Sequence, residues 1–306
     1  MSRIQFIKHA DIDQQKWNGC VTQSSNGLIY AYASYLDAMT AGQWDALVLN
    51  DYEAVMPLTW NRKYGIYYLY QPFFCASLGV FSKQSMTKEL LSNFLHALPQ
   101  RFKYVDIYLN QQNLFTIDGF PFTERINYVL KLDESYESIS NKYRTNLKRN
   151  IKKAEESKLI VRDDIAIRDI LSLAKETMQR VSPITDEQVA RFEHVFSFAK
   201  QQTSAETIGI YSQRNELLAS AAFLHSHNRW YYILVGNHPN GKTLGASHYL
   251  IDRFIHKHAS TNDLLDFEGS DIRNLAFFYS SYGAVEEKYP ALRMNRLPKL
   301  LRWLKD

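Results

Sequence analysis

Apolar and polar residues alternate in short runs that are separated by longer amphipathic stretches along the whole chain. Strict alternation is typical of strands, and apolar positions three and four residues apart are typical of helices. The pattern predicts helices at residues 11–19, 31–41, 84–98, 135–157, 166–181, 185–202, 243–259 and 272–280. It predicts strands at residues 44–50, 53–60, 66–71, 104–110, 128–132, 207–211, 217–225, 230–235 and 264–268.

The predicted elements follow the same order twice. Residues 44–110 read as three strands joined by two hairpins, then a helix and a strand, and residues 207–268 repeat that order with negligible residue identity. A repeated order of elements indicates two copies of one structural unit, and tight hairpins make most neighbouring strands antiparallel. We therefore expect an α+β protein with two similar domains, residues 1–127 and 128–306, each a mixed, largely antiparallel sheet flanked by helices.

The composition is that of a globular chain with substantial cores. Of its 306 residues, 45% are hydrophobic and 14% aromatic, and only 12 are glycine and 8 proline. These figures exclude collagen-like and disordered classes. The net charge of +4 is too small to predict DNA binding. Because no apolar run reaches the ~18 residues of a membrane span, we expect no integral membrane association.

Two further features bear on the compartment. Cys20 and Cys75 lie far apart and form no C-x-x-C pair, which favours two reduced thiols over a disulfide framework. The first fifteen residues, MSRIQFIKHADIDQQ, carry charges throughout and lack the apolar core of a signal peptide. We expect a cytoplasmic protein.

The predicted helix around residues 141–157, NKYRTNLKRNIKKAEES, is strongly basic. Tyr143, Leu147, Ile151 and Ala154 fall on one face at helical spacing, while lysines and arginines occupy the rest of the circumference. Like charges four residues apart cost stability, so this helix predicts a polyanion nearby, such as the phosphates of a cofactor or an RNA. The alternative is an ordinary solvated amphipathic helix.

Residues 236–243, GNHPNGKT, satisfy the phosphate-loop pattern G-x-x-x-x-G-K-[ST] after a predicted strand. Read literally, the pattern predicts a nucleotidase, but the preceding strands form hairpins and Pro239 lacks a backbone donor. The general prediction is an anion site, because a helix N-terminus presents free N–H groups and positive dipole charge. Its candidate residues are Gly241, Lys242, Gly245, Ser247 and His248.

Three segments carry a resemblance to a known family. Residues 142–154 resemble a basic R-x-x-I-R-x-A helix, residues 265–270 (LDFEGS) a D-F-x-G strand end, and residues 278–284 (FYSSYGA) an F-K-x-x-F-G segment. In this order they resemble the tandem-GNAT N-acyltransferases related to the Fem family, the aminoacyltransferases of the peptidoglycan bridge. The pattern covers nearly the whole chain.

The resemblance implies two GNAT-like domains and an acyl transfer without metal. The second domain is expected to bind an acyl-CoA donor at residues 236–248, with Arg144 and Arg149 adding positive charge. The first domain is expected to contact a small-molecule or peptide amine through Tyr70 and Gln71, although a buried core strand also explains Tyr70.

Tyr279 stands where Fem enzymes have a lysine, which disfavours a tRNA donor. The alternatives are an aminoacyl-tRNA-dependent transferase acting on a cell-wall precursor and a non-catalytic tandem-GNAT binding module.

Direct transfer to an amine needs a base for the amine and an acid for the leaving thiol, with no covalent enzyme intermediate. Asp266 and Glu268 are two apart on a predicted strand, so their carboxylates share a face and either is a candidate base; capping of the next helix is the alternative. Tyr279 is the candidate acid, with ordinary packing as its alternative. The pairs His225/His227 and His256/His258 lack a convergent partner, so we predict no metal.

Overall fold

The computed structural model describes residues 3–178, 185–202, 204–298 and 302. The chain divides into two compact units, Met1–Ile126 with Lys288–Asp306, and Asn127–Glu287. We call them the first unit and the second unit. Within the described residues, no helix combines the length and the apolar character that crossing a bilayer requires.

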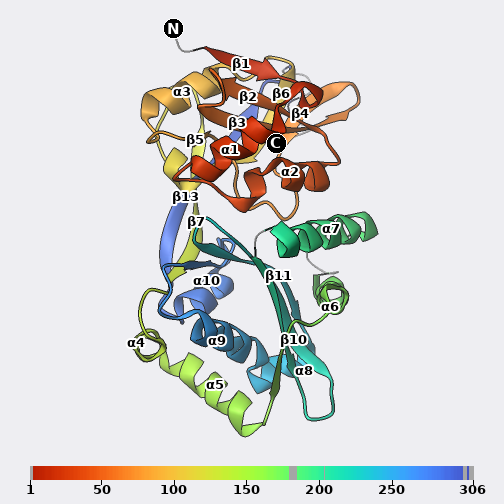
Figure 1. Cartoon of the computed structure of the whole chain (residues 1–306), viewed down its shortest axis with the longest axis vertical. Coiled ribbons are helices and arrows are strands. Elements are labelled where there is room, and N and C mark those ends of the chain that lie inside the picture. The colour runs from red at the N-terminus through yellow and green to blue at the C-terminus, as the bar shows by residue number, and fades with distance from the viewer. Residues whose placement is uncertain (1–2, 179–184, 203, 299–301, 303–306) are drawn as a thin grey trace. The chain divides into compact units, whose positions relative to one another are not determined.

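The first unit contains a mixed sheet with helices packed against it (Figure 1). Its strand order is β1-β2-β3-β4-β6-β13, antiparallel except for the β4–β6 pair. The elements that begin in it are β1 (Ile4–Ile7), η1 (His9–Asp11), α1 (Gln14–Gln23), η2 (Ile29–Ala31), α2 (Ala33–Thr40), β2 (Trp44–Leu49), β3 (Ala54–Lys63), β4 (Ile66–Tyr70), β5 (Phe81–Ser82), α3 (Lys88–His96), β6 (Phe102–Tyr108), η3 (Gln111–Asn113) and β7 (Phe122–Lys131).

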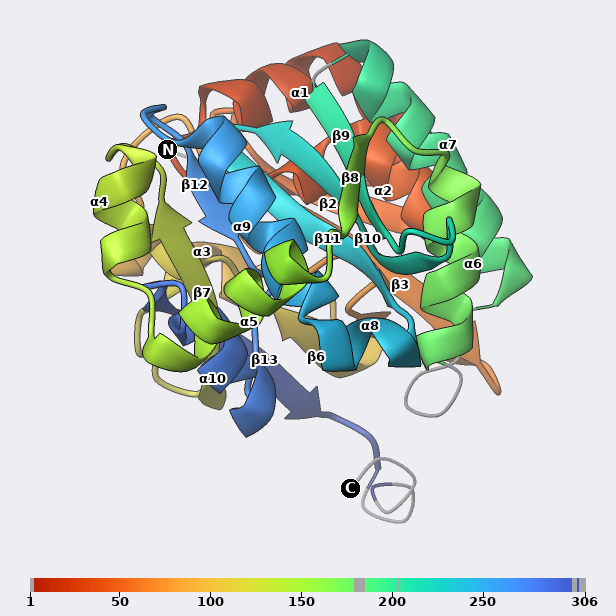
Figure 2. The same cartoon turned by 90° about the horizontal axis from the view of Figure 1, so that it is seen from below.

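The second unit is a helix–sheet–helix arrangement. Its strand order is β7-β12-β11-β10-β9-β8, antiparallel except for the β11–β12 pair. Helices α6 and α7 cover one face and α9 the other, with α5 packed on α9 (Figure 2). Its remaining elements are α4 (Tyr136–Asn141), α5 (Thr145–Glu156), β8 (Ile160–Asp163), α6 (Ile167–Met178), α7 (Asp186–Gln202), β9 (Ser204–Tyr211), β10 (Leu217–Ser226), β11 (Arg229–Asn237), α8 (Pro239–Leu244), α9 (Ala246–His258), β12 (Leu264–Asp266), α10 (Arg273–Ser280) and β13 (Val285–Asn295).

The two sheets share one pattern with an exchange of strands. In each, three antiparallel pairs lead to one parallel pair, and a last antiparallel strand closes the order. The closing strand of the first unit is β13, whose residues 291–295 pair with β6. The closing strand of the second unit is β7, whose residues 129–131 pair with β12. The expected mixed, largely antiparallel sheets flanked by helices are confirmed, and residues 288–306 lie in the first unit.

Several element predictions are wrong in detail. The helix expected at residues 135–157 is two helices, because Arg144 has an extended backbone and its N–H donates to the Ser281 carbonyl at 2.9 Å. Residues 239–244 are helical, where a loop was predicted. The strand expected at residues 264–268 ends at Asp266. The sequence pattern missed β1, β5, β8 and β13. Of the helix expected at residues 166–181, the last three lie outside the described residues.

Candidate functional site

One edge of strand β11 is paired with a neighbouring strand over only part of its length. β10 pairs with β11 along its whole length, whereas β12 pairs with it only from Arg229 to Tyr231. β12 stops at Asp266, so among the described residues no strand pairs with this edge of β11 from Tyr232 to Gly236. A register shift between Ala222 and Phe223 of β10 adds a bulge to the same stretch. Such an edge offers backbone donors and acceptors to an extended ligand.

The open edge leads to the N-terminus of α9. Gly245 precedes the helix in the left-handed conformation, with φ of 73°, and no side chain caps the first turn. Ser247 does not cap it either, because its hydroxyl hydrogen-bonds Asn237 Oδ1 at 2.5 Å. Burial lowers the pKa of His248 to about 4, so its imidazole is neutral at pH 7. The residue that precedes this 13-residue helix therefore offers no side-chain acceptor to its first N–H groups.

The glycines that suggested an anion loop have packing roles within this unit. A Cβ at Gly241 would overlap the Leu218 carbonyl of β10, and one at Gly245 would overlap the Asn150 carbonyl of α5. The missing side chain at Gly245 therefore lets the middle of α5 pack against the start of α9.

The three predicted positive contributors, Arg144, Arg149 and Lys242, lie at different places in the second unit. Arg149, exposed on α5, precedes the Asn150 backbone that contacts Gly245. Lys242 is exposed on α8. Arg144 lies against α10 instead, with its guanidinium carbon 4.9 Å from the centre of the Phe277 ring. The structure therefore places Arg149 and Lys242 beside the α8–α9 turn and Arg144 beside α10.

The two candidate carboxylates have different environments. Asp266 is 5% exposed; its Oδ2 accepts from Arg229 at 2.5 Å, and its Oδ1 accepts from Asn127 at 2.9 Å and from the Glu268 N–H at 2.8 Å. Burial raises the pKa of Asp266, and the Arg229 charge opposes that shift. Glu268 lies beyond the strand in a left-handed turn with φ of 65° and is partly buried. The prediction that both carboxylates share one strand face is wrong, because β12 ends before Glu268.

Tyr279 of α10 is buried beside these groups. Its ring stacks on Phe267, with centroids 4.7 Å apart and an interplanar angle of 23°. Burial raises the pKa of Tyr279, and the negative charges of Glu268 and Asp266 raise it further. The phenol therefore keeps its proton at neutral pH, within electrostatic range of Glu268.

Arg229, Asn127 and Glu287 complete this cluster and were not predicted. Arg229, 7% exposed, makes two hydrogen bonds to the Glu287 carboxylate, at 2.8 and 2.9 Å, besides the one to Asp266. A charged residue next to a hairpin turn is ordinarily exposed, so the sequence gives no signal for its burial.

Tyr70 and Gln71, the predicted acceptor contacts, belong to the first unit. The Gln71 amide donates to the Cys75 carbonyl at 2.7 Å and accepts from the Tyr108 N–H at 3.0 Å, so it fixes the segment after β4. Tyr70 is partly buried, and its ring lies 6.1 Å from that of Tyr68.

Two of the four histidines in the predicted pairs each lie next to one carboxylate. His225 lies 3.0 Å from Asp263, and His258 lies 3.2 Å from Glu206. Across the described residues, no three or more histidine, cysteine, aspartate or glutamate side chains converge as metal ligands would. Cys20 and Cys75 are buried thiols.

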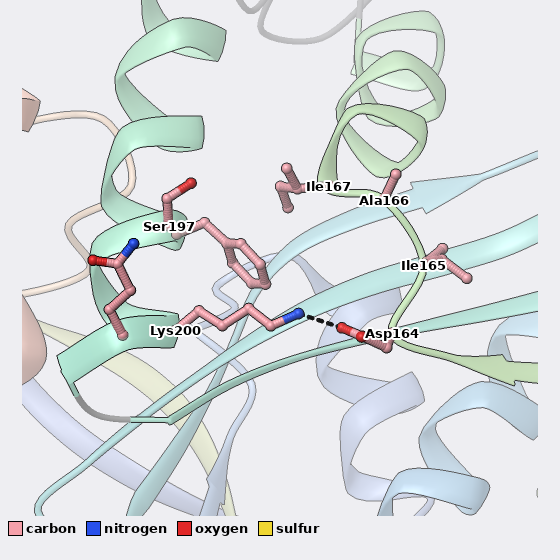
Figure 3. Close-up of a pocket in the computed structure, with 8 residues that line it drawn as sticks. Asp164, Ile165, Ala166, Ile167, Ser197 and Lys200 are labelled. Atoms are coloured by element: carbon pink, nitrogen blue, oxygen red, sulfur yellow. Dashed lines mark hydrogen bonds and ion pairs between the residues drawn. The ribbon is translucent and has the colours of Figure 1, made fainter.

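A separate pocket lies between the start of α6 and the end of α7 (Figure 3). An ion pair between Lys200 and Asp164 crosses it, and Ile165, Ile167 and Phe196 make it mostly apolar. None of the predicted site residues lines it.

Part of the second unit matches a described domain family. Residues 141–269 match the family model of the acetyltransferase (GNAT) domain. This match confirms the expected GNAT acyltransferase domain, which includes the open edge of β11, the start of α9 and the end of β12. No curated protein matches the chain.

Solved structures share the fold at low sequence identity. FemX is 13% identical with a TM-score of 0.66, and the match covers 96% of this chain and 99% of that one. A conserved protein of unknown function from Bacteroides thetaiotaomicron is 12% identical, with a TM-score of 0.59 and coverage of 95% and 100%. L-PGS from Bacillus licheniformis is 12% identical, with a TM-score of 0.57 and coverage of 94% and 93%. At these identities the likeness establishes the fold.

Proposed function

We propose that this GNAT acyltransferase moves an acyl group from an acyl-CoA donor directly to an amine. The observation that carries the proposal is the edge of β11 from Tyr232 to Gly236, which has no partner strand among the described residues and lies next to the start of α9, where Ser247 hydrogen-bonds Asn237. An acyl-CoA donor combines an extended chain of amides with a pyrophosphate. The backbone of an open strand edge can hydrogen-bond the amides, and a helix N-terminus can bind the pyrophosphate.

The residues around this edge fit a donor of that chemistry. Lys242 and Arg149 are exposed cations near the start of α9 and would attract the pyrophosphate. Ser247 and the neutral His248 occupy the first turn of the helix. Gly241 and Gly245 act indirectly in this proposal, because they let α8, α5 and α9 pack closely.

The transfer itself requires only proton movements by the protein. The amine nitrogen attacks the thioester carbonyl, and its proton passes to Glu268, directly or through a water. The tetrahedral intermediate then collapses, the carbon–sulfur bond breaks, and Tyr279 donates a proton to the departing thiolate. The phenol is protonated at neutral pH, which is the state that a proton donor needs. An amide and free coenzyme A leave, and Tyr279 and Glu268 exchange protons with water.

The acceptor is proposed only as an amine-bearing small molecule or peptide. Tyr70 and Gln71 remain predicted acceptor contacts in the first unit. A cytoplasmic location is part of the same proposal, because acyl-CoA donors are made and used there.

Calorimetry with coenzyme A, acetyl-CoA, Mg-ATP and an aminoacyl-tRNA tests the donor. We expect coenzyme A and acetyl-CoA to bind, and acetyl-CoA to release thiol when polyamines, amino sugars or lysine peptides are added. Binding of the aminoacyl-tRNA alone would show that the donor is an aminoacyl ester and not an acyl-CoA. Binding of Mg-ATP alone would reject acyl transfer, and binding of none would favour a non-catalytic module.

The variant Lys242→Ala locates the donor. We expect it to weaken coenzyme A binding about tenfold, the cost of one charge-assisted contact. Lys88→Ala, an exposed lysine in the first unit, is the control. Unchanged affinity in Lys242→Ala would remove this lysine from the donor site.

A further inference from the structure

The turn after β12 contains two consecutive residues with positive φ. Glu268 has φ of 65° and Gly269 has φ of 91°. Glycine adopts this conformation freely, but a glutamate in it costs about 1–2 kcal/mol. A residue held there needs surrounding contacts that impose the conformation, and such positions concentrate at functional sites.

Two side chains hold the backbone of this turn. The N–H of Glu268 donates to Asp266 Oδ1 at 2.8 Å, and the N–H of Gly269 donates to Asn127 Oδ1 at 2.5 Å. Asn127 in turn donates its amide hydrogen to Asp266 Oδ1 at 2.9 Å and accepts from the Tyr128 N–H at 2.8 Å. Both ends of the Asn127 amide are therefore used, which fixes its orientation.

A buried arginine fixes the aspartate. Arg229 contacts Asp266 Oδ2 at 2.5 Å and binds Glu287 through two hydrogen bonds. The side chains of Arg229 and Asp266 are only 8% and 6% exposed. A buried charge of this kind is costly unless it is fully paired, so Arg229 and Asp266 each depend on the other.

We propose that Asn127, Asp266 and Arg229 form a positioning network that holds Glu268 in its left-handed turn beside Tyr279. The inference rests on the proposed function, in which Glu268 is the base. Asp266 is then a positioning residue, since both of its oxygens are occupied by hydrogen bonds. Phe267, between the two acids, stacks on Tyr279, so the same short segment fixes the base and packs against the acid.

Hydrogen exchange tests the network without any substrate. In Asn127→Ala, the peptide covering residues 264–272 should exchange about tenfold faster, because Gly269 and Asp266 each lose a buried hydrogen bond. Asn262→Ala, an exposed position after α9, is the matched control and should leave the exchange unchanged. Unchanged exchange in folded Asn127→Ala would overturn the network.

Kinetics with acetyl-CoA and the best amine of the panel test the role of the network. We expect Asn127→Ala to lower kcat about tenfold or more while coenzyme A affinity stays the same, and to add nothing in a Glu268→Gln background, because Asn127 acts through Glu268. Asn127→Ser, whose hydroxyl keeps one donor and one acceptor, should retain more activity than Asn127→Ala, and it serves if the alanine variant does not fold.

The outcomes separate the two proposals. An inactive Glu268→Gln with a fully active Asn127→Ala would overturn the positioning role and leave the base in place. Full activity in Glu268→Gln would show that Glu268 is not the base, and the positioning role of the network would be rejected with it. The positioning role would also be overturned if Asn127→Ala lowered the activity of the Glu268→Gln variant by the same factor as that of the unmodified protein.

Discussion

At the scale of single residues, the two acids after β12 differ because of their hydrogen-bond partners. Both carboxylate oxygens of Asp266 accept hydrogen bonds, from Arg229, from Asn127 and from the Glu268 N–H. Glu268 lies past the end of the strand, where its negative charge raises the pKa of Tyr279. Two carboxylates with such different surroundings suit different roles, as is common where acid–base chemistry is performed.

Glu268→Gln is the direct test of the base. The substitution keeps the shape of the side chain but removes its ability to take a proton, so kcat should fall about 10²–10⁴-fold. Coenzyme A affinity, measured by calorimetry, should not change. Activity within about threefold of the unmodified protein, smaller than the effect of a general base, would remove Glu268 from the mechanism.

Glu206 provides a prediction on pH. Burial disfavours its charged form, but hydrogen bonds from His258 and Lys257, at 3.2 and 2.8 Å, outweigh burial and lower its pKa. A carboxylate with a lowered pKa stabilises the fold above its unfolded pKa, and this stabilisation is lost as the pH falls through the folded pKa.

Glu206→Gln should therefore cost stability at pH 7, and the difference from the unmodified protein should shrink as the pH falls below about 4.3, the usual glutamate value. Urea unfolding at a series of pH values measures this difference in the free energy of unfolding. Glu176→Gln, at an exposed position of α6, is the control. A difference that stays constant with pH would contradict the assignment.

At the scale of elements, the close approach of α5 and α9 depends on one residue without a side chain. Gly245 has a left-handed backbone and faces the Asn150 carbonyl. The same residue starts α9 without a capping side chain. One glycine thus sets both the packing of two helices and the absence of a capping side chain at the start of α9.

Gly245→Ala should destabilise the protein by about 2–4 kcal/mol, because it adds a left-handed alanine and an overlap with a backbone carbonyl. Gly19→Ala is the control: Gly19 lies within α1, and a Cβ there meets no atom within 4 Å. It should stabilise the protein by about 0.5–1 kcal/mol. Urea unfolding measures both, and equal effects would contradict the packing argument.

At the scale of the whole molecule, each sheet is completed by a strand that is distant in sequence from its partners. Leu292 of β13 is fully buried among residues of β3, β6 and α3. The first unit therefore folds around a strand that arrives about 180 residues after the strand it pairs with, which raises the loop-closure entropy that folding must overcome.

Leu292→Ala should destabilise the first unit by about 2–5 kcal/mol, the cost of a large-to-small change in a core. Hydrogen exchange should rise in peptides from β3 and β6 and stay the same in those from β10. Arg293→Ala, whose exposed pair with Asp106 is worth about 0–1 kcal/mol, is the control. A rise confined to β10 would show that β13 does not support the first unit.

The sequence by itself determined most of the long helices and strands and their repeated order, because alternation and helical spacing are local properties of neighbouring residues. It also identified the basic segment at residues 142–154 and the strand end at residues 265–269, both of which lie within the GNAT domain match. It did not reveal that the basic helix breaks at Arg144 or that Glu268 lies outside the strand.

Only the tertiary structure decided which strand closes each sheet, why the glycines are needed, and which groups surround Asp266. The partners of Asp266 are Asn127 and Arg229, 139 and 37 residues away in the chain. Strand pairing, close backbone approach and burial of a charge depend on residues far apart in sequence. No local pattern of side chains contains that information.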